Sequence, residues 1–182
     1  MADAQAPPSD WLVRHADLLP NNGVALDLAC GRGRHASWLA GAGLEVHAVD
    51  RDPDAIETVR RMAARRGLRI HTDVLDLEAG PLPFNRGCYD VIVGFHYLHR
   101  PLFPTLIDAL RSNGLLVYET FTIAQAARGK PTNPAFLLRP GELVRLVEPL
   151  TVVRSREGEF GGRDIASVVA RKTFELPAFD GA

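Results

Sequence analysis

Hydrophobic positions along the chain fall into short apolar runs that alternate with longer amphipathic segments. The runs predict strands, because they are short and bounded by turn residues. They cover residues 24–29, 44–50, 68–74, 89–98, 114–121, 150–160 and 165–174. The amphipathic segments predict helices over residues 11–19, 34–40, 53–66, 100–110 and 140–149. This alternation predicts a Rossmann-like α/β fold. We expect a doubly wound, mostly parallel seven-stranded sheet with helices on both faces.

Turn and capping residues set the boundaries of these elements. Asp52-Pro53 has the form of a helix start, and Gly67 has the form of a helix end. The turn sequence "EFGGRD" predicts a hairpin between the last two strands, so we expect the last strand to be antiparallel. Residues 1–182 are expected to form a single domain, with residues 1–9 as a loose tail.

The segment 122–140 has no clear period and contains three prolines. A loop of this length is uncommon inside a compact domain unless it has a function. We therefore expect either a lid or substrate loop, or an ordered surface connection. Lys130, Asn133 and Arg139 are its candidate contacts for an anionic substrate.

Composition narrows the class of protein. The chain has 46% apolar and 24% charged residues and a formal net charge of −1, which is typical of a globular protein and leaves no basic excess for nucleic acid or an anionic membrane. No apolar run approaches the roughly 20 residues of a membrane helix. Cys30 and Cys88 lack partners at metal-ligand spacing, so no metal site is expected. The N-terminal residues lack the pattern of a signal peptide, and we expect a cytoplasmic monomer or homodimer.

Acidic residues mark the ends of the first three predicted strands, where ligands bind in sheets of this type. Asp27 precedes Gly31 and Gly33, whose backbone allows close approach of a ligand. Asp50 ends the second strand, where an acid accepts hydrogen bonds from ribose hydroxyls. Asp76 lies just past the third strand, where its carboxylate either accepts a hydrogen bond from an adenine amino group or caps its own turn.

The glycine loop allows two interpretations. Residues 31–36, "GRGRHA", fit the dinucleotide fingerprint G-x-G-x-x-G/A, which makes an NAD-dependent oxidoreductase the alternative. Asp27, however, would repel a pyrophosphate and would favour a cationic ligand. The upstream acid and the acid after the third strand therefore favour a ligand other than NAD.

Two residues at the later strand ends are candidates for proton transfer. His96 follows the fourth strand, and Glu119 lies near the end of the fifth. Histidine is the usual acid or base in proteins, although a lone histidine in an apolar stretch is more often a core residue. The sequence does not tell whether Glu119 points inward or into solvent. These two residues are therefore the catalytic candidates if the reaction requires removal of a proton from a hydroxyl or an amine.

The stretch "VALDLACGRGRHASWLAGAGLEVHAVDRDPDAI" resembles the first two motifs of the class I S-adenosylmethionine-dependent methyltransferases. The usual first motif of that family is acid-x-Gly-x-Gly-x-Gly, and Ala29 replaces its first glycine here. The resemblance implies a sheet of seven strands with a reversed last strand, and S-adenosylmethionine as the cofactor. The cofactor-binding residues that it implies are Asp27, Ala29, Gly31, Gly33, Asp50, Arg51, Asp76, Leu77 and Phe95. The segment 129–143 resembles small bacterial methyltransferases of the tellurite-resistance group.

The resulting hypothesis is a methyltransferase that acts on a small-molecule acceptor. The resemblance implies a methyl donor that carries the hard chemistry, while the protein orients it. A thiolate, selenide or similar anion would need no general base. Alternatives are the NAD-dependent oxidoreductase and a non-catalytic S-adenosylmethionine-binding module, because no catalytic residue is unmistakable. Methylation of nucleic acid is a weaker alternative, since "GFHYLH" stands where an asparagine-proline-proline-aromatic site would follow the fourth strand.

Overall fold

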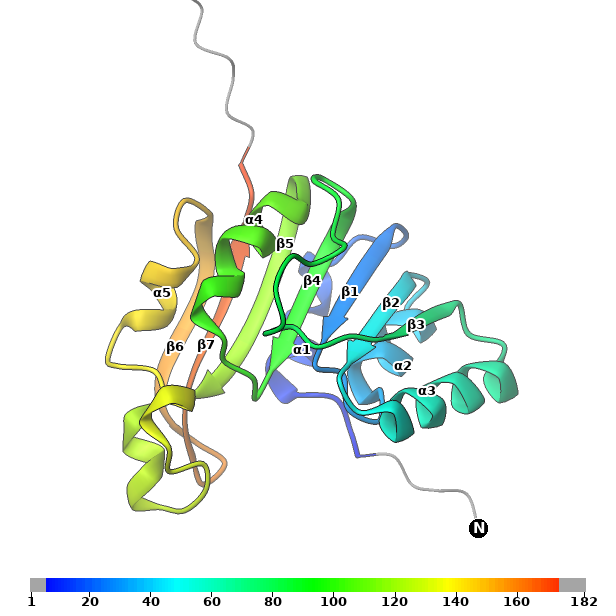
Figure 1. Cartoon of the computed structure of the whole chain (residues 1–182). Helices are drawn as coiled ribbons and strands as arrows, with labels where there is room; N and C mark the ends of the chain where they lie inside the picture. The colour runs from blue at the N-terminus through cyan, green and yellow to red at the C-terminus, as the bar shows by residue number, and fades with distance from the viewer. Residues whose placement is uncertain (1–5, 174–182) are drawn as a thin grey trace, which may run out of the picture.

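A computed structural model describes residues 6–173, and the predicted seven-stranded sheet is confirmed (Figure 1). Its strand order is β3-β2-β1-β4-β5-β7-β6. The strands are β1 (Val24–Leu28), β2 (Glu45–Asp50), β3 (Ile70–Val74), β4 (Tyr89–Phe95), β5 (Leu110–Phe121), β6 (Thr151–Phe160) and β7 (Arg163–Arg171). Strands β1 to β5 are parallel, and β7 runs antiparallel between β5 and β6.

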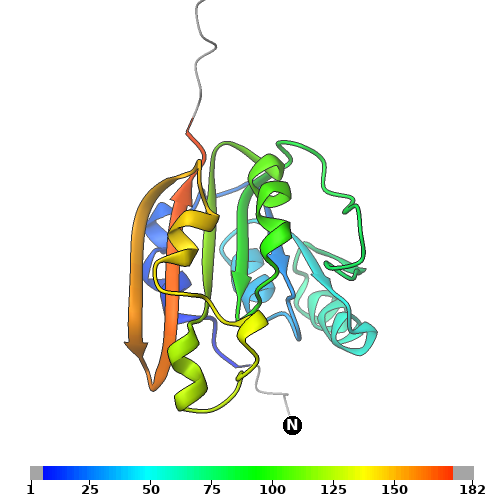
Figure 2. The same cartoon turned by 60° about the vertical axis from the view of Figure 1, so that its left-hand side comes forward.

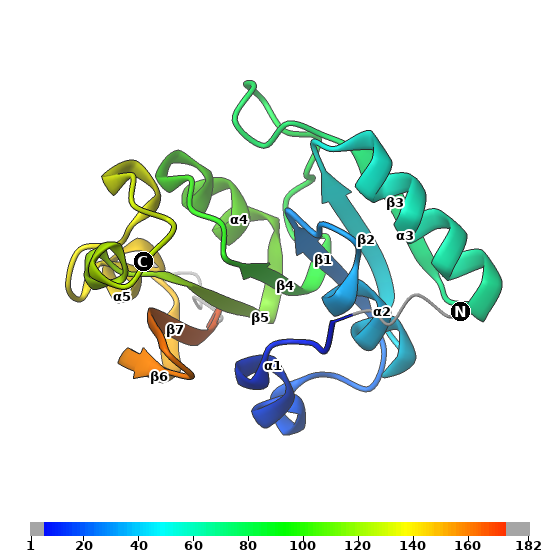
Figure 3. The same ribbon diagram turned by 90° about the horizontal axis from the view of Figure 1, so that it is seen from below.

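Helices cover both faces of the sheet, as predicted (Figure 3). They are α1 (Asp10–Arg14), α2 (Arg34–Gly41), α3 (Pro53–Arg66), α4 (Phe103–Ala109) and α5 (Glu142–Leu146). The first three helices lie on one face, and α4 and α5 lie on the other. Each face buries its own apolar core, with Leu39 and Val59 in one and Phe103 and Leu106 in the other. The two cores hold the strands rigidly, so their carboxyl ends form a fixed platform.

The capping signals fall where the sequence places them. Asp52 caps α3 by accepting the Asp54 N–H at 2.9 Å, and Gly67 ends that helix in the left-handed region. Two predicted helices are shorter than expected. The first ends at Arg14 and continues as a 3₁₀ turn over Ala16–Leu18, and the helix predicted over 140–149 covers only Glu142–Leu146.

The fourth predicted helix, over residues 100–110, begins as a 3₁₀ turn, η2 (Arg100–Leu102), before α4. The fifth strand starts earlier than expected, at Leu110. The segment 122–140 contains two short 3₁₀ turns, η3 (Ile123–Ala127) and η4 (Pro134–Phe136). None of the helices within residues 6–173 has the length and apolar composition needed to cross a membrane.

Strands β3 and β4 are joined by residues 75–88, which form no helix. One face of β2 and β3 therefore carries polar side chains in cross-strand contact. His47 lies 2.8 Å from Asp73 and 2.7 Å from the Tyr89 hydroxyl, and His71 lies 3.0 Å from Glu45.

Candidate functional site

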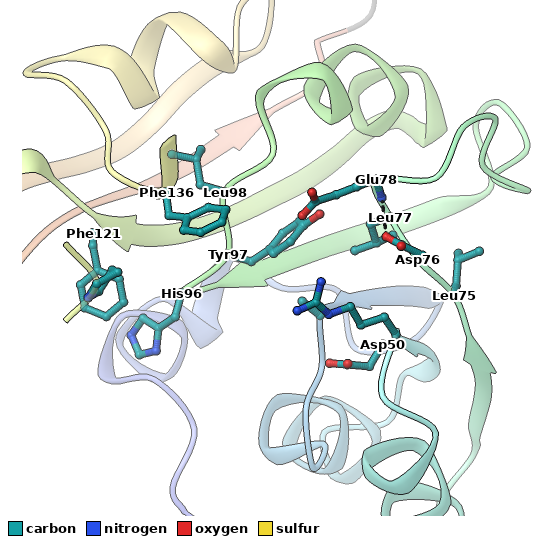
Figure 4. A pocket seen from close by; sticks show the side chains of 13 residues that line it. Asp50, Leu75, Asp76, Leu77, Glu78, His96, Tyr97, Leu98, Phe121 and Phe136 are labelled. Atoms are coloured by element: carbon teal, nitrogen blue, oxygen red, sulfur yellow. Dashed lines mark hydrogen bonds between the residues drawn. The ribbon is translucent and has the colours of Figure 1, made fainter. Parts of the chain in front are cut away.

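A cavity of about 360 Å³ opens at the carboxyl ends of the parallel strands (Figure 4). Its size lies in the range of small-molecule and cofactor sites. Residues that follow β1 to β5 line it together with the segment 131–136. The lining residues are Ala29, Asp50, Arg51, Leu75, Asp76, Leu77, Glu78, His96, Tyr97, Leu98, Phe121, Pro131 and Phe136.

The loop after β1 is held in an unusual backbone conformation. Ala29 has a φ of 49°, Gly31 of 52° and Gly33 of 77°. Gly33 has no room for a side chain, because an added Cβ would lie 2.8 Å from Val59 of α3. Ala29 adopts the left-handed region without glycine's freedom, and it lines the cavity. The glycines themselves do not line the cavity but hold the loop beside it.

Asp27 lies behind this loop and is 1% exposed. Its Oδ2 accepts the Ala36 N–H at 2.8 Å, so the carboxylate caps the start of α2. Its Oδ1 has no hydrogen-bond partner within residues 6–173. Burial raises the pKa of Asp27 to about 7, against the lowering effects of the Ala36 N–H and Arg34. A buried carboxylate with a free oxygen suits a cationic group, although Asp27 itself does not line the cavity.

Asp50 joins the first two motifs. One oxygen accepts the Gly31 N–H at 2.8 Å, and the other accepts the Asp52 N–H at 3.0 Å. The carboxylate faces the cavity beside the exposed Arg51 (Figure 4). The Gly31 N–H is thus used to orient this acid.

Asp76 and Leu77 line the cavity after β3, as expected. Oδ1 of Asp76 accepts the Glu78 N–H at 2.9 Å and forms a turn, and within the described residues no other hydrogen bond to this carboxylate is present. Both functions considered for Asp76 are therefore compatible, because one oxygen caps the turn and the other is left for a ligand. Leu77 is buried and supplies an apolar wall.

Phe95 is buried beneath the site and does not line the cavity. Its ring stacks on His35 with the centroids 4.1 Å apart. His35 is 4% exposed, and its Nε2 accepts the Ser9 N–H at 3.2 Å. Burial, followed by the charge of Arg34, lowers the pKa of His35 to about 3, so the ring is neutral at physiological pH.

His96 lines the cavity in a left-handed conformation with a φ of 59°, which is rare outside glycine. Strained backbone of this kind is common at functional sites. The ring stacks on Phe121 at 4.8 Å, and Nε2 lies 3.5 Å from Nη1 of Arg163. Burial, together with Arg34 and Arg163, lowers the pKa of His96 to about 4. Neither arginine forms an ion pair with an acid in the described part of the chain.

Glu119 is 4% exposed and lies outside the cavity lining. Oε1 accepts the Ser9 hydroxyl at 3.0 Å, while Oε2 accepts the Ser167 hydroxyl at 2.7 Å and Arg156 at 3.1 Å. Its backbone carbonyl accepts the His96 N–H at 2.8 Å. The side chain thus joins the N-terminal segment to β5 and β7, and the backbone holds His96.

The segment 122–140 contributes Pro131 and Phe136 to the cavity, and Figure 4 labels Phe136 there. Figure 2 shows the segment, lime to yellow, at the carboxyl end of β5. Lys130, Asn133 and Arg139 are exposed and do not line the cavity. Sequence reasoning missed Pro131 and Phe136 as individual lining residues; a bulky apolar residue in a proline-rich segment without a period was the available signal for Phe136.

Within residues 6–173, two buried side-chain atoms without hydrogen-bond partners test the fit of a cofactor. They are Oδ1 of Asp27 and the hydroxyl of Tyr97, whose side chain lines the cavity. Buried polar groups are rarely left unpaired, so each calls for a ligand or water. A ligand with a cationic amine, a ribose and an adenine has groups that match Asp27, Asp50 and Asp76. The residues present therefore fit S-adenosylmethionine.

Comparisons with known proteins agree with this geometry. Residues 25–114 match the family model described as "Methyltransferase domain". A probable S-adenosyl-L-methionine-dependent methyltransferase, TehB, of Haemophilus influenzae is 30% identical over 91 residues, which cover 48% of this chain and 31% of the relative. A protein named Hemagglutinin 1 of Eikenella corrodens is 35% identical over 88 residues, which cover 48% of this chain and 29% of that protein. The matched segments thus span about a third of these curated relatives.

The crystal structure of TehB from Haemophilus influenzae has the same fold. It superposes with a TM-score of 0.80 at 20% identity and covers 94% of this chain and 64% of that chain. The similarity in fold therefore includes the last two strands, β6 and β7, which lie outside the residues of the family match.

Proposed function

We propose that this chain is a class I S-adenosylmethionine-dependent methyltransferase, with S-adenosylmethionine as its cofactor, and that it methylates a small-molecule acceptor. One observation carries this proposal. A single cavity connects the acids Asp50 and Asp76 with an aromatic wall that includes His96 and Phe121. We call the part of the cavity beside these acids its first half and assign it to the cofactor. We call the part beside the aromatic residues its second half and assign it to an acceptor.

The first half of the cavity would hold the cofactor. When bound, S-adenosylmethionine supplies a methyl group activated on a sulfonium cation. We assign Asp27 to the positive end of the ligand, Asp50 to the ribose hydroxyls and Asp76 to the adenine amino group. Ala29, Arg51 and Leu77 also line the cavity. Gly31 and Gly33 shape the loop, and Phe95 supports it from below through His35.

The second half of the cavity would orient the acceptor and exclude water. Tyr97, Phe121 and Phe136 present ring surfaces, and Pro131 adds an apolar edge (Figure 4). Orientation and exclusion of water are the main contributions that a protein makes to a transfer of this kind. The cavity is small and is walled by the chain's own segment 131–136, which supports a small molecule rather than a macromolecule.

Proton transfer falls to His96 in this proposal. Its imidazole lines the cavity and is neutral at physiological pH, so it can accept a proton from a hydroxyl or amine, but a pKa of about 4 makes it a weak base. Arg34 and Arg163 make the surroundings of this ring positive, which favours an acceptor whose nucleophilic atom is already anionic. Glu119 would act as a positioning residue, because its oxygens are occupied by Ser9, Ser167 and Arg156.

A methyl-transfer assay tests the proposal. The protein is incubated with S-adenosylmethionine labelled at the methyl group and with a panel of thiols, phenols, amines and carboxylic acids. Parallel reactions contain total RNA, DNA and protein. The proposal expects label in a small-molecule product. Label in a macromolecule, or no transfer to any acceptor by a protein that binds the cofactor, would overturn it.

A further inference from the structure

We propose that Phe136 and Phe121 form an acceptor subsite for a molecule with an apolar, ring-shaped body, and that Arg100 is the positioning residue that fixes Phe136 there. This inference rests on the proposed function and adds the class of acceptor. Phe136 lines the cavity and yet is 48% exposed, whereas the two leucines that follow it are buried. A large apolar side chain held in a cavity wall is typical of a binding surface.

Arg100 grips the backbone on both sides of Phe136. Nη1 donates to the Ala135 carbonyl at 2.8 Å, and Nη2 donates to the Leu137 carbonyl at 2.8 Å. The same guanidinium forms a bidentate pair with Glu142 at 2.6 and 2.9 Å. This pair lowers the pKa of Glu142 to about 2, so its charge is present at physiological pH. A planar guanidinium has several N–H donors and can bind two carbonyls and a carboxylate at once, which the ammonium group of a lysine does less well.

The hydrogen bonds of Arg100 connect two segments that line the cavity, the loop after β4 and the segment 131–136. Arg100 follows closely after His96, Tyr97 and Leu98, which line the cavity after β4. The Tyr97 carbonyl accepts the hydroxyl of the buried Tyr118 at 2.9 Å, which fixes this loop from the core. Arg100 therefore connects the loop after β4 directly to the backbone on either side of Phe136.

Further contacts hold the segment after Phe136. Leu138 is fully buried; its N–H donates to the Phe121 carbonyl at 2.9 Å, and its carbonyl accepts the Ile123 N–H at 2.9 Å. Phe136 is therefore anchored from both directions while its ring stays in the cavity. The rings of His96 and Phe121 stack at 4.8 Å and line the same cavity (Figure 4). Several rings in the lining of one cavity favour a flat apolar body by stacking and burial.

A pair of unreactive methylated products tests the subsite. Thioanisole and 2-(methylthio)ethanol carry the same S-methyl group, but only thioanisole has a ring. Each is titrated by ligand-observed NMR into the full chain saturated with S-adenosylhomocysteine. We expect thioanisole to bind about tenfold more tightly, and Phe136→Ala to remove most of that difference. Phe136→Leu should retain part of it. The control Val144→Ala, an exposed apolar residue of α5 outside the cavity lining, should leave it unchanged.

The contribution of Arg100 is measured by the dissociation constant of 2-(methylthio)ethanol divided by that of thioanisole. This ratio is used because a general loss of stability would weaken the binding of both ligands alike. Arg100→Ala should lower the ratio toward that of Phe136→Ala. Arg100→Lys keeps the charge but not the guanidinium, and Glu142→Gln keeps the guanidinium but weakens its anchor; both should lower the ratio by less. An unchanged ratio in all three variants would overturn the assignment of Arg100.

The failure of this inference and of the proposed function are distinguishable. Equal binding of the two ligands, or a ratio unaffected by Phe136→Ala, would overturn the subsite although S-adenosylhomocysteine still binds. Loss of S-adenosylhomocysteine binding in the unmodified chain would instead remove the proposed function.

Discussion

The backbone N–H of Gly31 donates a hydrogen bond of 2.8 Å to the carboxylate of Asp50. This contact links the loop after β1 to the end of β2, two motifs that are separated by 19 residues in the chain. The second oxygen of Asp50 is held by the Asp52 N–H. Two backbone donors thus fix the acid in the cavity before any ligand arrives, and such preorganisation reduces the cost of binding.

Substitution of Asp50 should weaken cofactor binding. Asp50→Ala removes acceptors for the ribose hydroxyls, and losing a hydrogen bond to a charged group costs about 1.5–3 kcal/mol. We expect affinity for S-adenosylhomocysteine to fall about tenfold or more in calorimetric titration. Asp52→Asn preserves a good helix cap and serves as the matched control. Equal affinity of Asp50→Ala and the control would contradict the assignment.

Ala29→Gly should stabilise the fold. A left-handed backbone costs an alanine about 1–2 kcal/mol, and glycine's entropy offsets part of that gain, so we expect about 1 kcal/mol of added stability. Urea unfolding measures it. Ala64→Gly, at an exposed position inside α3, should lose about 1 kcal/mol in the same assay. If both glycine variants are destabilised, Ala29 is not strained.

Acid should destabilise the protein through His35. The pKa of this ring is about 3 when folded and near 6.5 when unfolded, because burial opposes its charge. The unfolded state therefore takes up a proton first, and stability present above pH 6.5 is lost as the pH falls toward 3. Unfolding free energies between pH 4 and 7 should fall less steeply in His35→Gln. An identical slope in both proteins would contradict the buried neutral ring.

Binding of the cofactor should be coupled to the release of a proton from Asp27. Its folded pKa of about 7 lies above the ordinary 3.8, so its contribution to stability is full below pH 3.8 and is lost as the pH rises through 7. A cation at Oδ1 would favour the ionised form and release the proton. Affinity for S-adenosylhomocysteine should therefore fall by up to about tenfold per pH unit below pH 7.

Calorimetry in two buffers of different ionisation enthalpy measures the protons released by this binding. Asp27→Asn should abolish the release and flatten the pH dependence. Binding that releases no proton at pH 6 in the unmodified chain would contradict a cationic group at Asp27.

Local signals allowed much of the fold to be predicted. The helix limits at Asp52 and Gly67 depend on capping chemistry within a few residues, and they were confirmed. Apolar runs located the central strands such as β1 and β4, because burial on both faces leaves little choice of residue. The acids Asp50 and Asp76 fell at the cavity because parallel strands bring their carboxyl ends to one edge.

Contacts between distant segments escaped prediction. Nothing in the sequence around Arg100 indicates its partners, and only the fold places it against the carbonyls around Phe136. Glu119 gives no sign of its partners, since Ser9 lies 110 residues away. The early end of α1 at Arg14 likewise follows from packing of the N-terminal segment rather than from its own propensity.

Calorimetric titration of the full chain with S-adenosylhomocysteine, beside a fluorescence titration with NADH, tests the central claim most directly. The cavity between Asp50 and Asp76 is predicted to bind the homocysteine ligand with one-to-one stoichiometry and to leave NADH fluorescence unchanged. No heat at millimolar S-adenosylhomocysteine, or NADH binding in its place, would contradict the assignment of the site.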